Sequence, residues 1–474
     1  MKRWLTIFIL IGWIASNAQV RSCNCNEIFK ETVQKIYNDY IGFALQKREK
    51  EKDFAHQVYV YDSLTQRTGL NECTSLLQLF LRFFKDGHLF VSELPVYSDS
   101  QLSVLKTDLK STDFSSSELA RLIMAKNPVS DLEGEWTDGS SKFAVVKNPG
   151  KNWPYEYIAI IIDASDKSKI GEFKFGVNLK NNKWEGIYYT NKYAPRYTEV
   201  EAVRQGSILN IWGGILWGRL DLKGAPLVEN LSGFDPVLPE INRIDSLFTL
   251  IRLPTFLLDK PKFDKVLYEH EKDILESKFL IIDLRGNGGG NAIYWDLLSF
   301  YSDSTRPVME ETGLALASAD NIHYFQKYSS NDNDNPYSHV VSDMKEHMGE
   351  IVKGPIFSPI QLPTRKSNIA KVIILTDHSN ISAAETFILH SKQVSTKVLT
   401  MGESTGGVVD LDNVNSISLD CGYRGTSLGY PMFSRNNHIL KDGYNKTGIQ
   451  PDVQINKGEE DWIFFAQKYL TRHS

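Results

Sequence analysis

A serine stands between a strand-like and a helix-like pattern in the stretch VIILTDHSNISAAETFILHSKQ, residues 372–393. Ser382 follows the apolar run and precedes the helix-forming run. Serine is a favoured N-terminal helix cap, so capping alone explains its position. It could also be an exposed nucleophile, because unpaired N–H groups and the helix dipole favour negative charge at a helix start. The stretch by itself leaves both interpretations open.

A glycine-rich stretch, LIIDLRGNGGGNAIY at residues 280–294, is the second candidate for chemistry. It follows an apolar strand and precedes a helical pattern, as a dinucleotide-binding fingerprint does. Asn291 stands where the third glycine of that fingerprint would be, and no Gly-Lys-Ser/Thr follows, so the pattern disfavours phosphate binding. Glycines can instead let backbone N–H groups approach a substrate and stabilise a developing oxyanion. A tight turn without chemistry is the other interpretation.

Several motifs occur in one order along the chain and belong together: DGHL (86–89), LIIDLRGNGGG (280–290), ILTDHSNISAAETF (374–387) with GESTGG (402–407), and TGIQPDV (447–453). Combined, they resemble the tail-specific (C-terminal processing) serine protease superfamily, in the branch that includes the tricorn protease core and the retinoid-binding protein of photoreceptors. The resemblance covers residues 236–474 and a patch around His88. It implies a crotonase-like α/β core that hydrolyses peptide bonds without a metal or cofactor.

The resemblance assigns the serine of the SAAE motif to Ser382, which makes this residue the expected nucleophile. A serine hydroxyl is weakly nucleophilic and needs a base and a prepared electrostatic site. We expect the N–H of Ala383 to donate to the oxyanion, with Gly289 or its neighbour Gly288 as the second donor.

The expected base is His88, because the histidine of the family's DGH patch falls on this residue. Imidazole suits the task because it titrates near neutrality. Many relatives use a lysine instead, but Val408 occupies that position, so a Ser–Lys dyad is not expected. In the non-catalytic interpretation, His88 is a surface histidine at a helix end. His378 is a rival base without a motif to support it.

The third member of the expected triad is less well defined. Relatives often carry a glutamate shortly before the C-terminal motif, and here Asn445 stands in its place. An amide can hold an imidazole by a hydrogen bond, but it stabilises the imidazolium less than a carboxylate would. Asn445 is therefore a possible orienting group, and Asp442 is near enough in sequence to replace it.

The elements that must position these residues fall into three zones. Residues 19–90 form an expected N-terminal helical segment that carries His88, with apolar residues at three- and four-residue steps. Residues 91–235 contain short aromatic and β-branched runs between turn residues, which predicts an antiparallel barrel or sandwich where relatives have a PDZ domain. Residues 236–474 alternate apolar strands with helices, which predicts a mostly parallel sheet. The expected fold class is thus α/β: a crotonase-like core, a preceding antiparallel β domain and an N-terminal helical segment.

Composition and targeting signals restrict the class of partner and the cellular compartment. The chain has 474 residues and a formal net charge of −5 without a basic tract, which argues against a nucleic-acid partner. Residues 1–18 have the charged, apolar and small-residue regions of a secretory signal peptide. No other segment is apolar enough to span a membrane, so we expect an exported, periplasmic or extracellular mature chain of bacterial origin. In that compartment Cys73 can form a disulfide with Cys25 or Cys23.

The leading hypothesis is an exported, metal-independent serine endopeptidase acting on peptides or unfolded proteins. The alternative is a non-catalytic peptide- or lipid-binding protein that retains the protease fold, which the departure at Asn445 favours. The sequence predicts neither the oligomeric state nor the cleavage preference.

Overall fold

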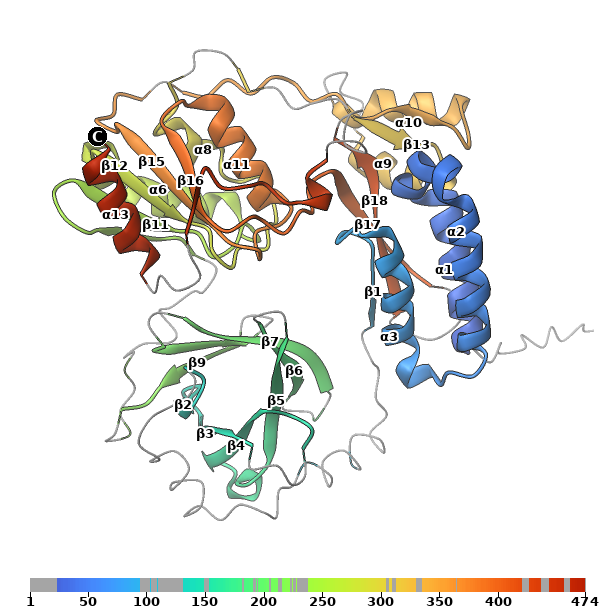
Figure 1. Ribbon diagram of the computed structural model, residues 1–474, viewed down its shortest axis with the longest axis horizontal. Coiled ribbons are helices and arrows are strands. Elements are labelled where there is room, and N and C mark those ends of the chain that lie inside the picture. The colour runs from blue at the N-terminus through green and yellow to red at the C-terminus, as the bar shows by residue number, and fades with distance from the viewer. Residues whose placement is uncertain are drawn as a thin grey trace, which may run out of the picture.

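The computed structural model describes most of the chain between Asn24 and His473. Its secondary structure falls into an α/β core, a second sheet covered by the N-terminal helices, and a closed barrel (Figure 1). The residues that it does not describe are 1–23, 94–102, 104–108, 110–130, 149–152, 181–182, 191–192, 194, 204–205, 212–214, 222–223, 225–226, 228–237, 304–306, 309–312, 330–334, 364, 420–425, 436–442, 456–460 and 474.

The core is a six-stranded sheet of order β10-β11-β12-β15-β16-β19. Its neighbouring strands are parallel, apart from the antiparallel pair β10–β11. Every residue of β12 is buried, as expected for a parallel sheet covered on both faces. The strands are β10 (Glu240–Arg243), β11 (Phe248–Arg252), β12 (Phe279–Asp283), β15 (Lys371–Thr376), β16 (Val398–Gly402) and β19 (Val453–Gln454).

Helices cover both faces of this sheet. Leu280 and Ile282 of β12 pack with the apolar side chains of α6, α7, α8 and α11, whereas Phe279 and Ile281 pack with those of α13. This alternation follows from the two-residue period of a strand. The helices are α6 (Lys260–Glu269), α7 (Glu271–Glu276), α8 (Trp295–Ser299), α11 (Ala383–Val394) and α13 (Trp462–Arg472).

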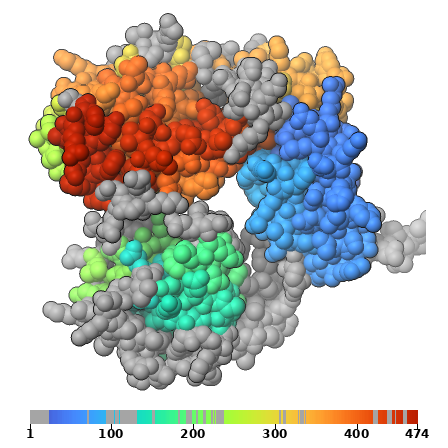
Figure 2. Space-filling model, in the orientation of Figure 1, coloured from blue at the N-terminus to red at the C-terminus, as the bar shows by residue number. Residues whose placement is uncertain are grey.

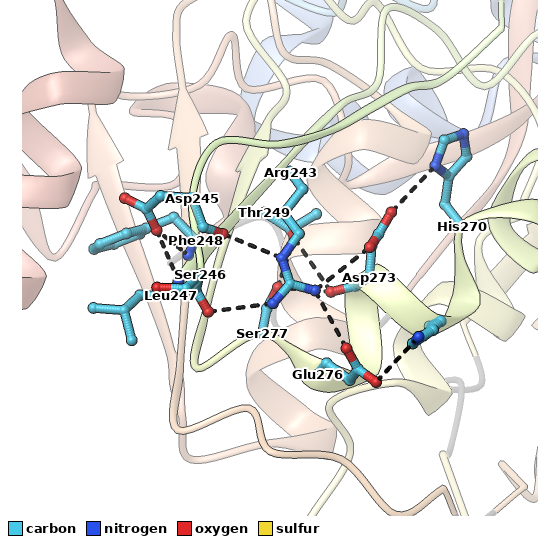
Figure 3. A network of polar contacts seen from close by, with 11 residues as sticks. Arg243, Asp245, Ser246, Leu247, Phe248, Thr249, His270, Asp273, Glu276 and Ser277 are labelled. Carbon is cyan, nitrogen blue, oxygen red and sulfur yellow. Dashed lines mark hydrogen bonds and ion pairs between the residues drawn. The ribbon is translucent and has the colours of Figure 1, made fainter.

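A polar network fastens the β10–β11 turn to α7 (Figure 3). Arg243 lies 3.4 Å from a carboxylate oxygen of Asp273 and 3.5 Å from one of Glu276. In the same network, the hydroxyls of Thr249 and Ser277 are 2.6 Å apart in a buried contact. These contacts hold the edge of the core and do not reach the motifs that carry the expected chemistry.

The second sheet joins segments that are far apart in the chain. Strand β1 pairs with β18, so the segment that follows His88 lies beside the C-terminal part of the sequence. The strand order is β1-β18-β13-β14, and β17 also pairs with β18. The strands are β1 (Phe90–Glu93), β13 (Leu314–Leu316), β14 (Ile351–Lys353), β17 (Leu411–Ser418) and β18 (Thr426–Ser434).

Helices of the N-terminal segment and of the 319–346 region pack on this second sheet in one apolar cluster. A disulfide joins Cys25 of α1 to Cys73 of α3, and Cys23 and Cys421 lie outside the described residues. The elements are α1 (Cys25–Asp39), α2 (Ile41–Thr65), α3 (Leu70–Leu81), η1 (Arg82–Phe84), α9 (Ala319–Tyr328) and α10 (Pro336–Glu346).

The helical pattern at residues 26–47 is interrupted at Tyr40, which the sequence periodicity does not predict. Tyr40 has extended backbone angles (φ −86°, ψ 111°), so α1 ends before it and α2 begins after it. Its side chain is buried, and its hydroxyl donates to a carboxylate oxygen of Asp86 at 2.8 Å. The break therefore places a hydrogen-bond donor beside the DGH patch.

Strands β2 to β9 close into an antiparallel barrel, as expected for the aromatic-rich region. Trp136 and Trp217 are buried inside it, and the ring of Trp217 stacks on Phe143 at 3.8 Å. Figure 2 shows the barrel and the N-terminal helices on two sides of a hollow below the core. The strands are β2 (Gly134–Thr137), β3 (Ser141–Lys147), β4 (Tyr157–Ala164), β5 (Phe173–Lys180), β6 (Lys183–Tyr189), β7 (Pro195–Val203), β8 (Ile208–Ile211) and β9 (Ile215–Arg219), with the short helix η2 (Lys167–Lys169) after β4.

The expected fold class is confirmed: the chain is a mixed α/β protein with an antiparallel β domain and N-terminal helices. The expected signal peptide lies outside the described residues, and the domain boundaries stay predictions. Among the described helices, none combines the length and apolarity needed to cross a bilayer.

Candidate active site

Ser382 lies at the turn between β15 and α11 with a backbone conformation that is unusual for a residue with a side chain. Its φ is +55° and its ψ −123°, and its side chain makes no capping hydrogen bond to α11. Left-handed conformations of non-glycine residues cost about 1–3 kcal/mol and persist where the surroundings enforce them, often at functional sites. The capping interpretation therefore has no hydrogen bond to support it, and the hydroxyl is left uncommitted to the helix.

The turn that carries Ser382 is held by a buried amide. Asn380 is fully buried, and its side chain accepts from the N–H of Asp377 at 2.9 Å and donates to the carbonyl of Leu284. Its own carbonyl accepts from the N–H of Gly406 at 2.8 Å. One residue thus ties together the turn before Ser382, the glycine-rich loop and the GESTGG loop.

Glu385 of the SAAE motif anchors the loop on the other side of Ser382. Its fully buried carboxylate accepts from the N–H groups of Gly407 (3.0 Å) and Val408 (2.7 Å) and from the hydroxyl of Thr405. Burial raises the pKa of Glu385, although these hydrogen bonds oppose the shift. A Ser-x-x-Glu spacing can form a capping box; here the glutamate contacts the backbone of Ser382 and also holds the 405–408 loop.

Val408 links the nucleophile turn to the DGH patch. Its carbonyl accepts from the N–H of Ser382 at 3.1 Å. Its side chain is buried and packs so closely on Gly87 that a Cβ at Gly87 would lie 2.8 Å from a Val408 methyl group. The residue that replaces the family's lysine therefore brings the segments of Ser382 and His88 together.

His88 follows η1 in a turn that begins at Lys85, which has a left-handed backbone (φ 53°). The N–H of His88 donates to a carboxylate oxygen of Asp86 at 2.9 Å, and the Tyr40 hydroxyl donates to the other oxygen. Burial raises the pKa of Asp86. The turn is therefore fixed by Asp86 and, behind it, by Tyr40.

The imidazole of His88 is oriented by a backbone carbonyl. Its Nδ1 lies 2.6 Å from the carbonyl oxygen of Leu411, the first residue of β17. A carbonyl can only accept, so Nδ1 carries the hydrogen of this bond and Nε2 of a neutral ring is left as an acceptor. This is the tautomer that a general base requires.

Asn445 does not make the contact expected of an orienting group. Its Oδ1 accepts from the N–H groups of Val409 and Asp410, both at 3.0 Å. The carboxylate of Asp410 in turn accepts from the N–H groups of Tyr444 and Asn445. Asn445 thus holds the backbone that leads into Leu411, and Asp442 lies outside the described residues.

The glycine-rich loop packs directly on Ser382. Gly289 has a φ of +89°, and a Cβ on it would lie 2.7 Å from the carbonyl oxygen of Ile381 and 3.0 Å from the Cβ of Ser382. Its N–H already donates to Oδ1 of Asn287 at 2.8 Å. In the described part of the structure, no hydrogen bond uses the N–H of Gly288 or of Ala383. The available donors are therefore Ala383 and the exposed Gly288, rather than Gly289.

His378 is an exposed residue of the loop that precedes Asn380. Within the described residues, no hydrogen bond joins its ring to Ser382. No group of three or more His, Cys, Asp or Glu side chains among these residues is arranged to hold a metal ion.

Sequence reasoning missed three contributors to the site: the carbonyl of Leu411, Tyr40 and Asp412. No motif marks a backbone carbonyl, and the role of Tyr40 depends on a helix break. Asp412 follows Leu411, and the charge of His88 contributes to lowering the pKa of Asp412. Its position five residues after the GESTGG motif is the one signal in the sequence that could have found it.

Residues 248–455 match the model of peptidase family S41. The resemblance to tail-specific serine proteases is confirmed. The matched segment is a little under half of the chain and includes Ser382, the glycine-rich loop and Asn445, but not His88. It supports a peptidase, and the family implies a serine peptidase hydrolase.

Solved structures with similar chains have low identity to this one. Mature CPAF complexed with lactacystin is 13% identical, with a TM-score of 0.45 over 94% of this chain and 97% of the other. A lipoprotein from Streptococcus agalactiae is 12% identical, with a TM-score of 0.39 over 99% and 100%. The photosystem II D1 C-terminal processing protease is 12% identical, with a TM-score of 0.35 over 91% and 93%. No curated protein matches the chain.

Proposed function

We propose that this protein is an exported serine endopeptidase in which Ser382 is the nucleophile and His88 the general base. The observation that carries the proposal is the strained, uncapped Ser382 at the start of α11. A strained serine on a strand-to-helix turn is how hydrolases expose a nucleophile next to helix N–H groups. The S41 match over this segment agrees with a peptidase.

In this mechanism the Ser382 oxygen attacks the carbonyl carbon of the scissile peptide bond, and its proton passes to Nε2 of His88. The electron pair of the carbonyl moves to its oxygen, where the N–H groups of Ala383 and Gly288 donate to it. Collapse of the tetrahedral species releases the amine, which takes the proton from His88. Water then repeats the cycle on the acyl-enzyme and frees Ser382.

The test is labelling of the mature protein with a fluorophosphonate, together with cleavage of an unstructured polypeptide. Ser382→Ala should abolish both. Ser379→Ala is the matched control, because Ser379 lies three residues away in the same turn and should leave both unchanged. Undiminished labelling of the Ser382→Ala protein would sink the assignment. A chelator should leave cleavage unaffected.

A second candidate function, a peptide- or lipid-binding protein without turnover, is favoured by one observation. The N–H of Gly289 already donates to Asn287, so one of the two glycine N–H groups that were candidates for the oxyanion is in use. Saturable binding of a peptide with no cleavage and no fluorophosphonate labelling would support this function over the peptidase.

A further inference from the structure

The group that orients His88 carries no negative charge to balance a protonated imidazole. When Ser382 gives up its proton, His88 becomes an imidazolium, and a nearby carboxylate normally stabilises that cation. The partner of Nδ1 here is the carbonyl of Leu411, which orients the ring but has no net charge. The residue in the family's acid position, Asn445, is also neutral and bonds elsewhere. A negative charge has to come from another part of the site.

Two carboxylates interact electrostatically with His88, those of Asp86 and Asp412. Asp86 lies in a buried position next to the hydroxyl of Tyr40, and burial raises its pKa, with a further contribution from Asp410. Both effects favour the neutral carboxylic acid over the anion. Asp86 is therefore suited to fixing the turn and less suited to balancing a cation.

The pKa of Asp412 is shifted in the opposite direction to that of Asp86. Burial acts to raise the pKa of Asp412, but the charges of Arg435 and His88 outweigh burial, and the pKa is lowered. One carboxylate oxygen accepts from Nε of Arg435 at 3.0 Å, and Arg435 donates a second hydrogen bond to the same oxygen. The other oxygen accepts from the N–H of Asn413 at 2.7 Å. Asp412 is held as an anion in a fixed orientation.

The same ion pair also holds the carbonyl that orients the ring. Asp412 directly follows Leu411, and both pair with the end of β18: Leu411 lies opposite Ser434 and Asp412 opposite Phe433. Arg435 is the next residue after β18, and its N–H donates to the carbonyl of Asp410 at 3.0 Å. The Asp412–Arg435 pair therefore closes the β17–β18 ladder at the point where the Leu411 carbonyl meets Nδ1.

We propose that Asp412 is the charged positioning residue of this site, which keeps the Leu411 carbonyl on His88 and stabilises the protonated imidazole during acyl transfer. This inference rests on the proposed function, since it assigns the third member of the same triad. In this assignment, two roles that one carboxylate has in an ordinary triad fall to neighbouring residues. The carbonyl of Leu411 sets the tautomer of His88, and the anion of Asp412 balances its charge.

The kinetic test compares Asp412→Asn with Asp412→Glu on a peptide that the wild-type protein cleaves. Asparagine removes the charge and keeps an oxygen for the Asn413 N–H, whereas glutamate keeps the charge. We expect Asp412→Asn to lower kcat by about tenfold or more with KM little changed, and Asp412→Glu to recover part of the loss. The acid limb of the kcat/KM profile should move to lower pH, because a lost negative charge disfavours the imidazolium.

A second measurement does not depend on activity. In a Ser382→Ala background with ¹³C-labelled histidine, NMR follows the titration of His88 and reports its tautomer. We expect Asp412→Asn to lower the titration midpoint of His88 by about half a unit or more. Asp86→Asn is the comparison variant, with a smaller shift expected because burial raises the pKa of Asp86, whereas that of Asp412 is lowered.

The outcomes separate the two proposals. An unchanged midpoint in Asp412→Asn, or equal losses of kcat in the asparagine and glutamate variants, overturns the role of Asp412 even if Ser382 is the nucleophile. If Ser382→Ala keeps full labelling, the proposed function fails, and the catalytic role of Asp412 fails with it. A lowered midpoint together with a charge-dependent loss of kcat supports the inference.

Discussion

Replacing Ser382 with glycine should make the protein more stable while removing its activity. The φ of +55° costs a residue with a Cβ about 1–3 kcal/mol, and glycine avoids most of this cost. Glycine loses about 0.5–1 kcal/mol more in chain entropy than alanine. The net expectation is a gain of about 0.5–2 kcal/mol in the free energy of unfolding relative to wild type.

Ser382→Ala completes the comparison, because it keeps the strain and removes only the hydroxyl. Since the hydroxyl makes no capping hydrogen bond, alanine should change the free energy of unfolding by less than about 0.5 kcal/mol. Urea-unfolding curves of the three proteins at pH 7, followed by circular dichroism, supply these values. Both variants should fail to react with a fluorophosphonate.

A capping serine would give another pattern. Alanine would then cost about 1 kcal/mol, and glycine a few tenths, both relative to wild type. If the alanine variant loses that much and the glycine variant gains nothing, the strained-nucleophile reasoning is refuted.

Three further predictions concern the surroundings of the site. Burial, aided by the charge of Arg435, lowers the pKa of His390 in α11 from 6.5 to about 4. The stability that the neutral, buried His390 contributes is therefore complete above pH 6.5 and is lost as the pH falls toward 4. Between pH 7 and pH 5, the free energy of unfolding in urea should fall by about 2 kcal/mol more for the wild-type protein than for His390→Phe. An equal fall in both proteins would contradict this prediction. Gly289→Ala should abolish cleavage, since its Cβ would lie 2.9 Å from the backbone nitrogen of Ala383; retained kcat would show that the loop moves freely. Cys25→Ser removes a cross-link between residues 48 apart and should lower stability by about 4 kcal/mol under non-reducing conditions, a loss that reductant should reproduce in the wild-type protein.

The sequence was most informative where local patterns and motifs act over short distances. Continuous apolar runs predicted the buried strands β12 and β15, since a strand covered on both faces has no polar side. Aromatic runs between turn residues predicted the antiparallel region, and its barrel closure was left open as one of two forms. The break at Tyr40 was missed because helical periodicity continues across it, and the buried contact of Tyr40 with Asp86 is seen only in the structure.

The site likewise contains residues that motifs indicated and contacts that only the structure shows. Ser382 and His88 could be proposed from motifs, and the roles of both remain proposals. The expected contact of Asn445 with the ring did not appear, because its amide oxygen is used by the backbone of residues 409 and 410. The choice between Gly288 and Gly289 as donor could not be made either, since it depends on which N–H the side chain of Asn287 takes.

The sequence by itself determined which residue types are present and the order of the strands and helices, because both follow from composition and short-range periodicity. The tertiary structure decided the conformation of Ser382, the carbonyl that meets Nδ1 of His88, and the anion that lies beside it. These depend on contacts between segments that are separate in the chain, and the contact of His88 with Leu411 joins residues more than 300 positions apart. No local pattern records such contacts, since they form only when β1 and β17 come to lie on either side of β18.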